Sequence, residues 1–276
     1  MSRAPSYDQR PMVDFTVMGV LNVTPDSFSD GGRWLDADAA VAHGRVLSAE
    51  GAQILDVGGE STRPGARSVD AAEELRRVLP VVERLAADGH TVSIDTSKLA
   101  VAAEAVAGGA RYVNDVTAFR ADPGMAALVA ETGCECCLMH MLGEPRTMQR
   151  DPRYDDVVDD VKAFLEERVA FALAEGVRED RIHVDPGIGF GKTAQHNLQL
   201  IRRLDEIVAL GLPVVLGTSR KSFLGAITGR DPRERVPGTI ATQVLGLERG
   251  ATVFRVHDVA PVVQALQVAA ATLAAP

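Results

Sequence analysis

The sequence has few cysteines, and all three lie close together, at Cys134, Cys136 and Cys137. A disulfide framework needs cysteines spread along the chain, and a zinc site needs a second group of Cys or His at suitable spacing; neither is present. Free cysteines commonly lie buried in protein cores. We therefore expect three buried thiols on one strand, with neither a structural disulfide nor a zinc site.

The chain also lacks any run of basic residues. It has 29 Lys and Arg against 38 Asp and Glu, which gives a formal net charge of -9 and a pI near 5.2. Nucleic-acid binding depends on clustered Lys and Arg, so this composition argues against it. An anionic small molecule remains possible as a ligand, because a few clustered cations can reverse the local sign of the charge.

Targeting and membrane segments are missing as well. Residues 1–11 are polar and lack the apolar centre of a secretory signal, and the apolar residues 261–276 are too few to span a bilayer. No linker or change of composition divides the chain. We expect a cytoplasmic protein with an N-terminal extension over residues 1–14 and a single domain over residues 15–276.

Short apolar strands alternate with amphipathic helices along the chain, which predicts a parallel sheet covered by helices. Eight strands, each followed by helix, in about 250 residues match the α/β fold known as the (β/α)8 TIM barrel. A doubly wound open sheet would show the same alternation, so the strand count decides for the barrel. The predicted strands are residues 15–23, 53–59, 91–96, 112–117, 134–141, 182–187, 213–219 and 253–257.

Polar side chains fall at the ends of most of these strands, where a (β/α)8 barrel forms its active site. One Asp at a strand end often only caps the next helix. Here, however, most of the predicted strands end in a polar residue, and together these residues indicate an active site rather than separate helix caps. Arg255 and His257 alternate along the last strand and so share a face; with Arg63 they would suit a diphosphate. The rim residues are Asn22, Asp56, Thr62, Arg63, Asp95, Asn114, Asp185, Lys221, Arg255 and His257.

Two further patterns concern anionic ligands. Residues 187–193 read G-I-G-F-G-K-T, but the phosphate-binding loop of nucleotide-binding proteins would need a glycine at Pro186, so we do not expect an ATP site. Arg220 and Lys221 begin a predicted helix, where each cation costs about 0.3–1 kcal/mol against the helix dipole. That placement indicates an anionic or electron-rich ligand near them.

Seven stretches carry a resemblance to a known family. On these stretches the sequence resembles the bacterial dihydropteroate synthases, the pterin-binding enzymes of folate biosynthesis that sulfonamides inhibit. They follow the order of the family over nearly the whole chain. They are residues 18–32, 56–65 (D-V-G-G-E-S-T-R-P-G), 93–98 (S-I-D-T-S-K), 113–116, 185–192 (D-P-G-I-G-F-G-K), 217–224 (G-T-S-R-K-S-F-L) and 255–258 (R-V-H-D).

The resemblance implies a transferase that joins p-aminobenzoate to 6-hydroxymethyl-7,8-dihydropterin diphosphate, releasing pyrophosphate and forming 7,8-dihydropteroate. It implies that the carbon–oxygen bond breaks largely before the amine attacks. It also implies Mg2+ as cofactor and a homodimer. The residues that it assigns to the pterin are Asp95, Asn114, Met139, Asp185 and Lys221, of which Asp95, Asn114, Asp185 and Lys221 are the catalytic set.

The same resemblance assigns the rest of the site. Asn22 would be the Mg2+ ligand, and Arg63, Arg255 and His257 would bind the diphosphate. Asp30 would lie on a first loop that closes over the site. The p-aminobenzoate pocket would be lined by Phe28, Thr62, Pro64, Phe190, Lys221 and Ser222.

Two other functions remain open. A pterin-dependent methyltransferase that passes a methyl group to a corrinoid would share the Asp and Asn residues that bind pterin, but it would need neither S-T-R-P nor a diphosphate site. A non-catalytic pterin-binding homologue would be expected to lose residues of the loops or around Lys221, and here they are intact. Residues 143–153 and 229–237 match nothing that we can assign.

Overall fold

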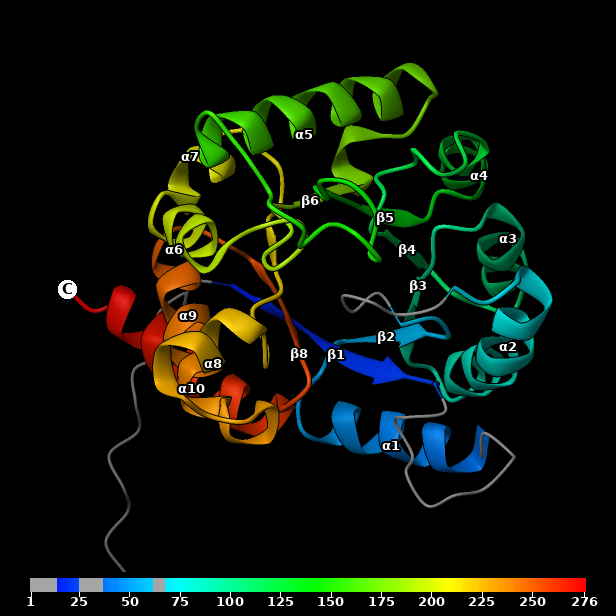
Figure 1. The fold of residues 1–276 in the computed structure, drawn as a ribbon. Coiled ribbons are helices and arrows are strands. Elements are labelled where there is room, and N and C mark those ends of the chain that lie inside the picture. Colours follow the sequence, from blue (N-terminus) through cyan, green and yellow to red (C-terminus); the bar gives the residue numbers. More distant parts are fainter. Residues whose placement is uncertain (1–13, 25–36, 62–67) are drawn as a thin grey trace, which may run out of the picture.

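Eight parallel strands form the centre of the molecule in a computed structural model that describes residues 14–24, 37–61 and 68–276 (Figure 1). Their order in the sheet is β6-β5-β4-β3-β2-β1-β8-β7, so neighbours in the chain are neighbours in space. The strands are β1 (Thr16–Asn22), β2 (Ile54–Gly58), β3 (Thr91–Asp95), β4 (Tyr112–Asp115), β5 (Glu135–Met139), β6 (Ile182–Asp185), β7 (Val215–Leu216) and β8 (Val253–Val256).

The two edges of this sheet meet between β6 and β7. A single parallel bridge joins Val184 to Val214, and the Val184 amide donates to the Pro213 carbonyl at 3.0 Å. The ladder there is short because β7 has only two residues, whereas β1 and β2 pair over five positions. The sheet thus closes into the predicted barrel, with its weakest lateral pairing at this seam.

Helices surround the barrel on all sides (Figure 1). Each buries an apolar stripe against the strands; in α2, for example, Val78, Val82 and Leu85 are buried, and the Asp70 carboxylate caps the first turn by accepting from the Glu73 amide at 2.8 Å. The helices are α1 (Ala37–Ala49), α2 (Ala71–Ala87), α3 (Leu99–Ala107), α4 (Gly124–Thr132), α5 (Val157–Ala174), α6 (Ala194–Arg202), α7 (Leu204–Val208), α8 (Ser222–Thr228), α9 (Val236–Glu248) and α10 (Val259–Leu273).

The interior of the barrel is layered. Side chains two residues apart on a strand point to the same face, so an apolar residue near the start of a strand is followed on that face by a polar one nearer its end. Ile54 precedes Asp56, and Tyr112 precedes Asn114. The lower layer is the buried cluster Met18, Ile54, Tyr112, Cys137, Val215 and Val253. This apolar layer fills the barrel interior near the starts of the strands, and the polar side chains form the next layer toward the strand ends.

The predicted fold is confirmed, and strand and helix ends differ from the predictions by a few residues. The helix predicted through residues 198–204 is divided into α6 and α7, since Arg203 interrupts it. The three cysteines are free and buried as predicted. The predicted N-terminal extension falls almost wholly outside the described residues. Within the described ranges, the structure has no helix that is both long and apolar enough to cross a membrane.

Candidate active site

Asp56 is the centre of the polar layer. It is fully buried at the middle of β2, and its carboxylate accepts three hydrogen bonds: from the Ser93 hydroxyl at 2.6 Å, from Asn114 Nδ2 at 3.1 Å and from Arg255 Nε at 2.6 Å. These partners come from β3, β4 and β8. One carboxylate therefore fixes side chains of three other strands, and Asn114 in particular has its amide orientation set by this contact.

Arg255 connects this group to Asp95. Its Nη2 donates to Asp95 Oδ2 at 2.7 Å, and its side chain is 21% exposed. Burial raises the pKa of Asp95 to about 7; Arg255 opposes that rise and the Asp56 charge adds to it. Burial works against the charge of Arg255, but Asp56 and Asp95 outweigh it and raise the pKa of Arg255. The guanidinium is thus held between two carboxylates at the barrel mouth.

Asp185 and Lys221 complete the rim on the other side. Asp185 ends β6, is 5% exposed and accepts from the Gly187 amide at 2.6 Å. Burial raises the pKa of Asp185, while the Gly187 amide and Lys221 oppose the rise. Lys221 precedes α8 as its N-cap residue, and its Nζ lies 4.0 Å from the centre of the Phe190 ring. The carboxylate of Asp185 and the amine of Lys221 thus lie on the same side of the barrel mouth.

An apolar wall lies beside these charges. Met139 ends β5, pairs in register with Asp185 and is 4% exposed. It belongs to a small buried cluster with Val116, Met141, Met148 and Phe190. A polarisable, unbranched side chain at this point suits the flat face of a heterocycle. Polar groups at the edges and an apolar wall together describe a site for a planar polar molecule.

Asn22 ends β1 and is partly exposed at the same rim. A Cβ on its partner Gly58 would lie 3.8 Å from Asn22 Oδ1 and 3.6 Å from Asp95 Oδ2, so the glycine leaves space between the two oxygens. Among the described residues no group of three or more His, Cys, Asp or Glu could hold a metal. Mg2+ commonly takes one or two protein oxygens and completes its shell with substrate phosphates and waters. The Asn22 side-chain oxygen is of the kind that such a Mg2+ site uses.

His257 follows β8 and is fixed by Ser219. Its backbone amide and its Nδ1 lie 3.1 Å and 3.0 Å from the Ser219 hydroxyl. Arg220, with φ of 58°, forms a bidentate pair with Asp258 at 2.5 and 2.9 Å. The sequence predicts that Arg220 and Lys221 begin a helix and lie near an anionic or electron-rich ligand. In the structure α8 begins two residues after Arg220, at Ser222, and Asp258 already neutralises Arg220.

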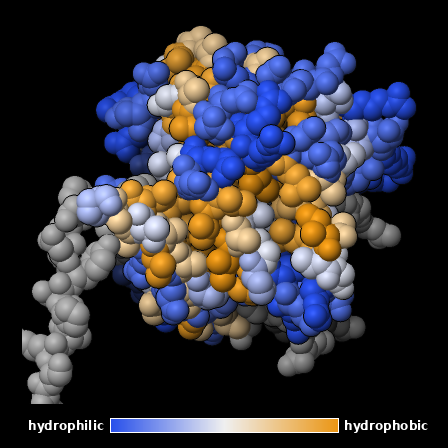
Figure 2. Space-filling model, turned by 90° about the vertical axis from the view of Figure 1, so that its left-hand side faces the viewer, coloured by the Kyte–Doolittle hydropathy of each residue, from blue (hydrophilic) through white to orange (hydrophobic). Residues whose placement is uncertain are grey.

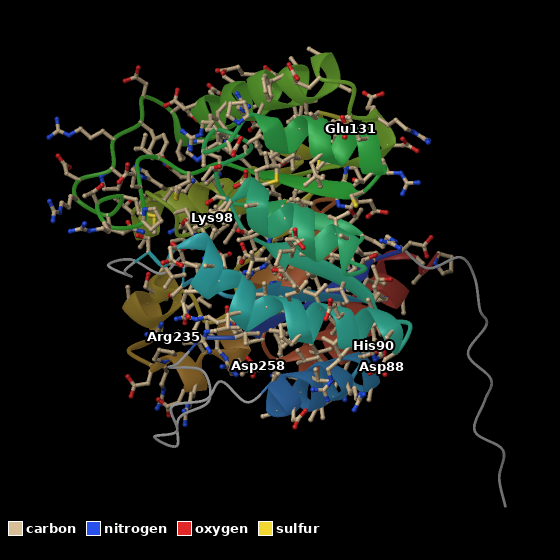
Figure 3. The ribbon with its side chains drawn as sticks, turned by 90° about the vertical axis from the view of Figure 1, so that its right-hand side faces the viewer. Asp88, His90, Lys98, Glu131, Arg235 and Asp258 are labelled. Carbon is tan, nitrogen blue, oxygen red and sulfur yellow. The ribbon has the colours of Figure 1, made fainter. Side chains whose placement is uncertain are left out.

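The loops after the strands gather at one end of the barrel. Figure 3 shows Lys98, Arg235 and Asp258 toward this end and His90 toward the opposite end. Arg235 Nη1 donates to the carbonyls of Arg220 and Lys221 at 3.1 and 3.3 Å, which holds the turn that carries Lys221. The predicted residues Asn22, Asp95, Asn114, Met139, Asp185, Phe190, Lys221, Arg255 and His257 all lie at the loop end; Ser222 is there too but is exposed.

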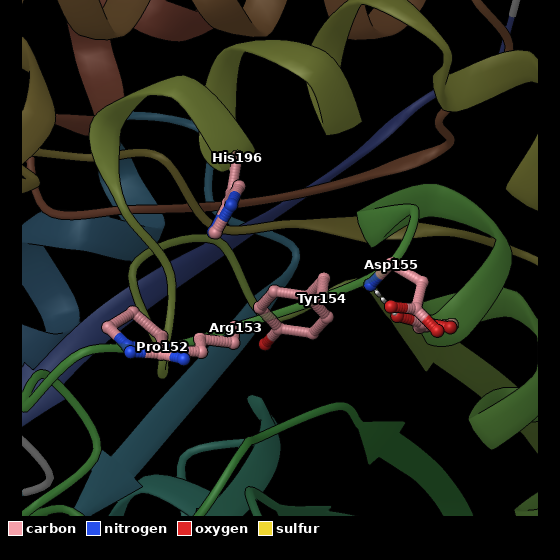
Figure 4. A pocket seen from close by; sticks show the side chains of 6 residues that line it. Pro152, Arg153, Tyr154, Asp155 and His196 are labelled. Atoms are coloured by element: carbon pink, nitrogen blue, oxygen red, sulfur yellow. Dashed lines mark hydrogen bonds between the residues drawn. The ribbon is translucent and has the colours of Figure 1, made fainter.

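Five predicted residues cannot be placed. Phe28, Asp30, Thr62, Arg63 and Pro64 lie outside the described residues, so their roles stay predictions. A cavity of about 530 Å³ lies elsewhere, at the start of α5 and α6, and none of the predicted residues lines it (Figure 4).

Comparisons with known proteins identify the family of the chain. Residues 18–257 match the family described as pterin binding enzyme. A dihydropteroate synthase of Mycobacterium leprae is 51% identical over 265 residues, covering 93% of this chain and 93% of that protein. The solved Xanthomonas albilineans dihydropteroate synthase with 4-aminobenzoic acid is 49% identical, with a TM-score of 0.90, covering 95% of this chain and 94% of that one. The Yersinia pestis enzyme with a sulfonamide drug is 44% identical, with a TM-score of 0.90, covering 95% of both chains.

The chain belongs to the dihydropteroate synthase family. Members of this family are transferases of folate biosynthesis, and this chain has that activity. The resemblance found in the sequence is thereby confirmed.

Two features of the site are not evident from the sequence of this chain. The pattern of strand ends indicates only that Asp56 lies at the rim, whereas in the structure it fixes three partners. Its position two residues after the inward-facing Ile54 is the sequence signal that could have placed it inside the barrel. Lys192 and His140 receive no role from the sequence, yet both are buried and lie in contact. In the sequence, Lys192 belongs to the incomplete nucleotide-loop pattern and ends the family stretch 185–192, but neither pattern shows its contact with His140.

Proposed function

We propose that the rim of this barrel holds the pterin of 6-hydroxymethyl-7,8-dihydropterin diphosphate, with p-aminobenzoate beside it, and that it carries out the synthase reaction there. The single observation that carries the proposal is the connected polar layer in which Asp56 joins Asn114 and, through Arg255, Asp95. A planar heterocycle with donors and acceptors at its edge needs such a set of fixed carboxylates and amides.

The proposed pterin contacts divide by chemistry. The carboxylates of Asp95 and Asp185 accept from ring N–H and amino groups, and Asn114 both donates and accepts. Met139 packs on the ring face. Lys221 donates to a ring acceptor, and its contact with Phe190 at 4.0 Å places that aromatic ring next to the amine-binding half of the site. The Xanthomonas albilineans and Yersinia pestis complexes support a neighbouring pocket that takes p-aminobenzoate and the sulfonamides that mimic it.

The diphosphate lies, in this proposal, against Arg255, His257 and Arg63. Nε and Nη2 of Arg255 donate to the carboxylates of Asp56 and Asp95. Its Nη1 has no hydrogen-bond partner among the described residues, so this nitrogen can donate to a phosphate oxygen. Asn22 Oδ1 would hold Mg2+ together with the phosphates. When bound, Mg2+ supplies Lewis-acid stabilisation of the charge that develops on the leaving group.

The reaction separates charge, and the residues match its two ends. The carbon–oxygen bond breaks and both of its electrons leave with pyrophosphate, so the pterin methylene becomes cationic. The buried carboxylate of Asp185 stabilises that cation, while Arg255 and His257 stabilise the anion. The p-aminobenzoate nitrogen then forms the new carbon–nitrogen bond and releases one proton to solvent. Exclusion of water by Phe190 and the apolar wall prevents hydrolysis of the cation.

A coupled pyrophosphate assay tests the proposal. Purified protein with Mg2+ is expected to release pyrophosphate only when both substrates are present, and EDTA is expected to stop turnover until Mg2+ is restored. Chromatography must show dihydropteroate in equal amount. Folded protein that binds a pterin but makes no product would favour the non-catalytic homologue. Release of a methyl group to a corrinoid, with no need for the diphosphate, would favour the methyltransferase.

We also propose that the chain forms a homodimer in the cytoplasm. Figure 2 shows a broad apolar area on the face built from α6 to α10. Exposed apolar patches of this kind mark protein contacts, and a second copy of the chain is the proposed occupant. One chain has a mass of 29.3 kDa, and light scattering is expected to give twice this value. The mass of a single chain would contradict the proposal. The exposed apolar residues of this face are Leu198, Ile227, Leu245, Val268 and Leu273.

A further inference from the structure

Lys192 is a buried cation that the proposed reaction does not use. It follows the β6 strand in the loop before α6 and is 3% exposed. Its Nζ lies 2.8 Å from His140 Nδ1 and donates to the Phe190 carbonyl at 3.1 Å. Burial and the charge of Lys192 lower the pKa of His140 to about 2, so the imidazole is neutral and its Nδ1 can accept. A charged amine therefore connects the loop after β5 to the loop after β6.

The loop that Lys192 closes is tightly packed. Gly187 has φ of 68°, and a Cβ there would lie 1.8 Å from the His140 carbonyl oxygen. A Cβ on Gly191 would lie 2.6 Å from the Leu142 carbonyl oxygen. Only glycine permits this approach of two backbones. Both ends of the loop are thus pressed onto the β5 loop, and Lys192 supplies the bonds that hold the segment between them.

Phe190 lies at the middle of this segment and is the part that faces the site. Its carbonyl accepts from Lys192, while its ring contacts Lys221 Nζ and the wall around Met139. Because backbone and ring belong to one residue, fixing the carbonyl restricts where the ring can lie.

We propose that Lys192 is a positioning residue for the p-aminobenzoate half of the site: it ties the Phe190 carbonyl to His140 and thereby holds the Phe190 ring against Lys221. This rests on the proposed function, which gives Phe190 its role in that pocket. Lys192 touches neither substrate in this arrangement and acts through Phe190. Its two hydrogen bonds join two loops that only the closed barrel brings together.

An aromatic shell keeps the Lys192 amine away from water. The Tyr154 hydroxyl donates to the Gly191 carbonyl at 2.7 Å, and the Tyr154 ring centre lies 5.9 Å from Lys192 Nζ. The His196 ring packs edge-on against Tyr154, with centres 5.0 Å apart (Figure 4). Shielded hydrogen bonds of a charged donor are stronger than exposed ones, which suits a fixed support.

Lys192→Met tests this, because methionine keeps the length of the chain and removes both donors. We expect the KM for p-aminobenzoate to rise about tenfold, with kcat and the dissociation constant of 6-hydroxymethylpterin changed by less than about twofold. Lys162→Met, on the outer helix α5, is the matched control and should leave all three unchanged. His140→Leu removes the acceptor from the other side; it should raise the same KM, and its effect should not add fully to that of Lys192→Met.

The outcomes separate the two proposals. If wild type makes no dihydropteroate, the proposed function fails. If wild type is active and Lys192→Met and His140→Leu both behave like Lys162→Met, only the positioning role fails. Equal losses in pterin affinity and in kcat would likewise overturn it, since they would mean a general loss of structure. Melting temperatures check folding, and if Lys192→Met does not fold, His140→Leu decides.

A pH profile gives a second readout that a merely structural role would not produce. Burial lowers the pKa of Lys192 to about 7. The amine is therefore protonated below pH 7 and loses its charge above it, so its hydrogen bonds weaken as pH rises. With pterin saturating, the KM for p-aminobenzoate should rise severalfold from pH 6 to pH 8 in wild type and stay flat in Lys192→Met; a flat wild-type profile contradicts the charge-assisted support. The groups facing Lys192 are His140, Tyr154, Asp185, His196 and Lys221.

Discussion

Replacing Asp185 by alanine is expected to lower kcat/KM by about a thousandfold, the loss typical of removing one preorganised electrostatic group from a reaction centre. Asp185 is buried at the end of β6. In the proposed arrangement its carboxylate faces the methylene carbon that becomes cationic when pyrophosphate leaves. No water can replace that charge in a closed site. Initial rates in the pyrophosphate assay and fluorescence titration with a pterin measure the effect.

The matched control is Asp205→Ala, which removes an exposed carboxylate from α7 on the outside of the barrel. Its rate should lie within about twofold of wild type, since a solvated surface charge far from the reaction contributes little. Both variants should melt at similar temperatures. A rate close to wild type in folded Asp185→Ala would mean that the pterin lies elsewhere.

The second large effect is expected on stability. Arg255→Met removes the guanidinium between Asp56 and Asp95, which are 0% and 7% exposed, and leaves two buried carboxylates facing each other. Breaking such a buried pair lowers the free energy of unfolding by about 3–5 kcal/mol. Urea unfolding at pH 8 measures it, and catalysis should be lost as well.

The pH dependence of that loss follows from the carboxylates. The pKa of Asp95 is already raised to about 7 by burial, and removing Arg255, which lowers it, raises it further. At pH 6 the carboxyl group takes up a proton and the repulsion disappears, so the loss of stability should be smaller at pH 6 than at pH 8. Arg178→Met, which breaks an exposed pair with Asp180, should cost less than about 1 kcal/mol at either pH. A loss in Arg255→Met as small as this control would contradict the central role of Arg255.

Strand order, the parallel sheet and the end of the barrel that carries the site could be predicted from the sequence. Periodicity and strand count depend only on which residues are apolar, and the strand ends follow from that pattern. The same pattern places Asn22, Asp95, Asn114 and Asp185 at the rim, where the strands β1, β3, β4 and β6 carry them.

The partners of each side chain could not be predicted in the same way. The sequence predicts that Arg255 binds a diphosphate together with Arg63 and His257. In the structure, two of its nitrogens donate to carboxylates of β2 and β3, which lie 199 and 160 positions earlier in the chain. Arg220 is paired to Asp258 for the same reason, across 38 positions. Which charges neutralise one another depends on lateral packing between strands, and sequence spacing does not contain that information.

The seam between β6 and β7 has a consequence for how the site responds to substrate. Asp185 ends β6 on one side of it, and Lys221 follows β7 on the other, while the pairing across it consists of one bridge. Small changes in the width of the barrel therefore concentrate there, because every other neighbouring pair of strands is held by a longer ladder. A ligand that contacts both Asp185 and Lys221 bridges this seam. Ligand binding at the barrel mouth should therefore make the whole barrel more rigid.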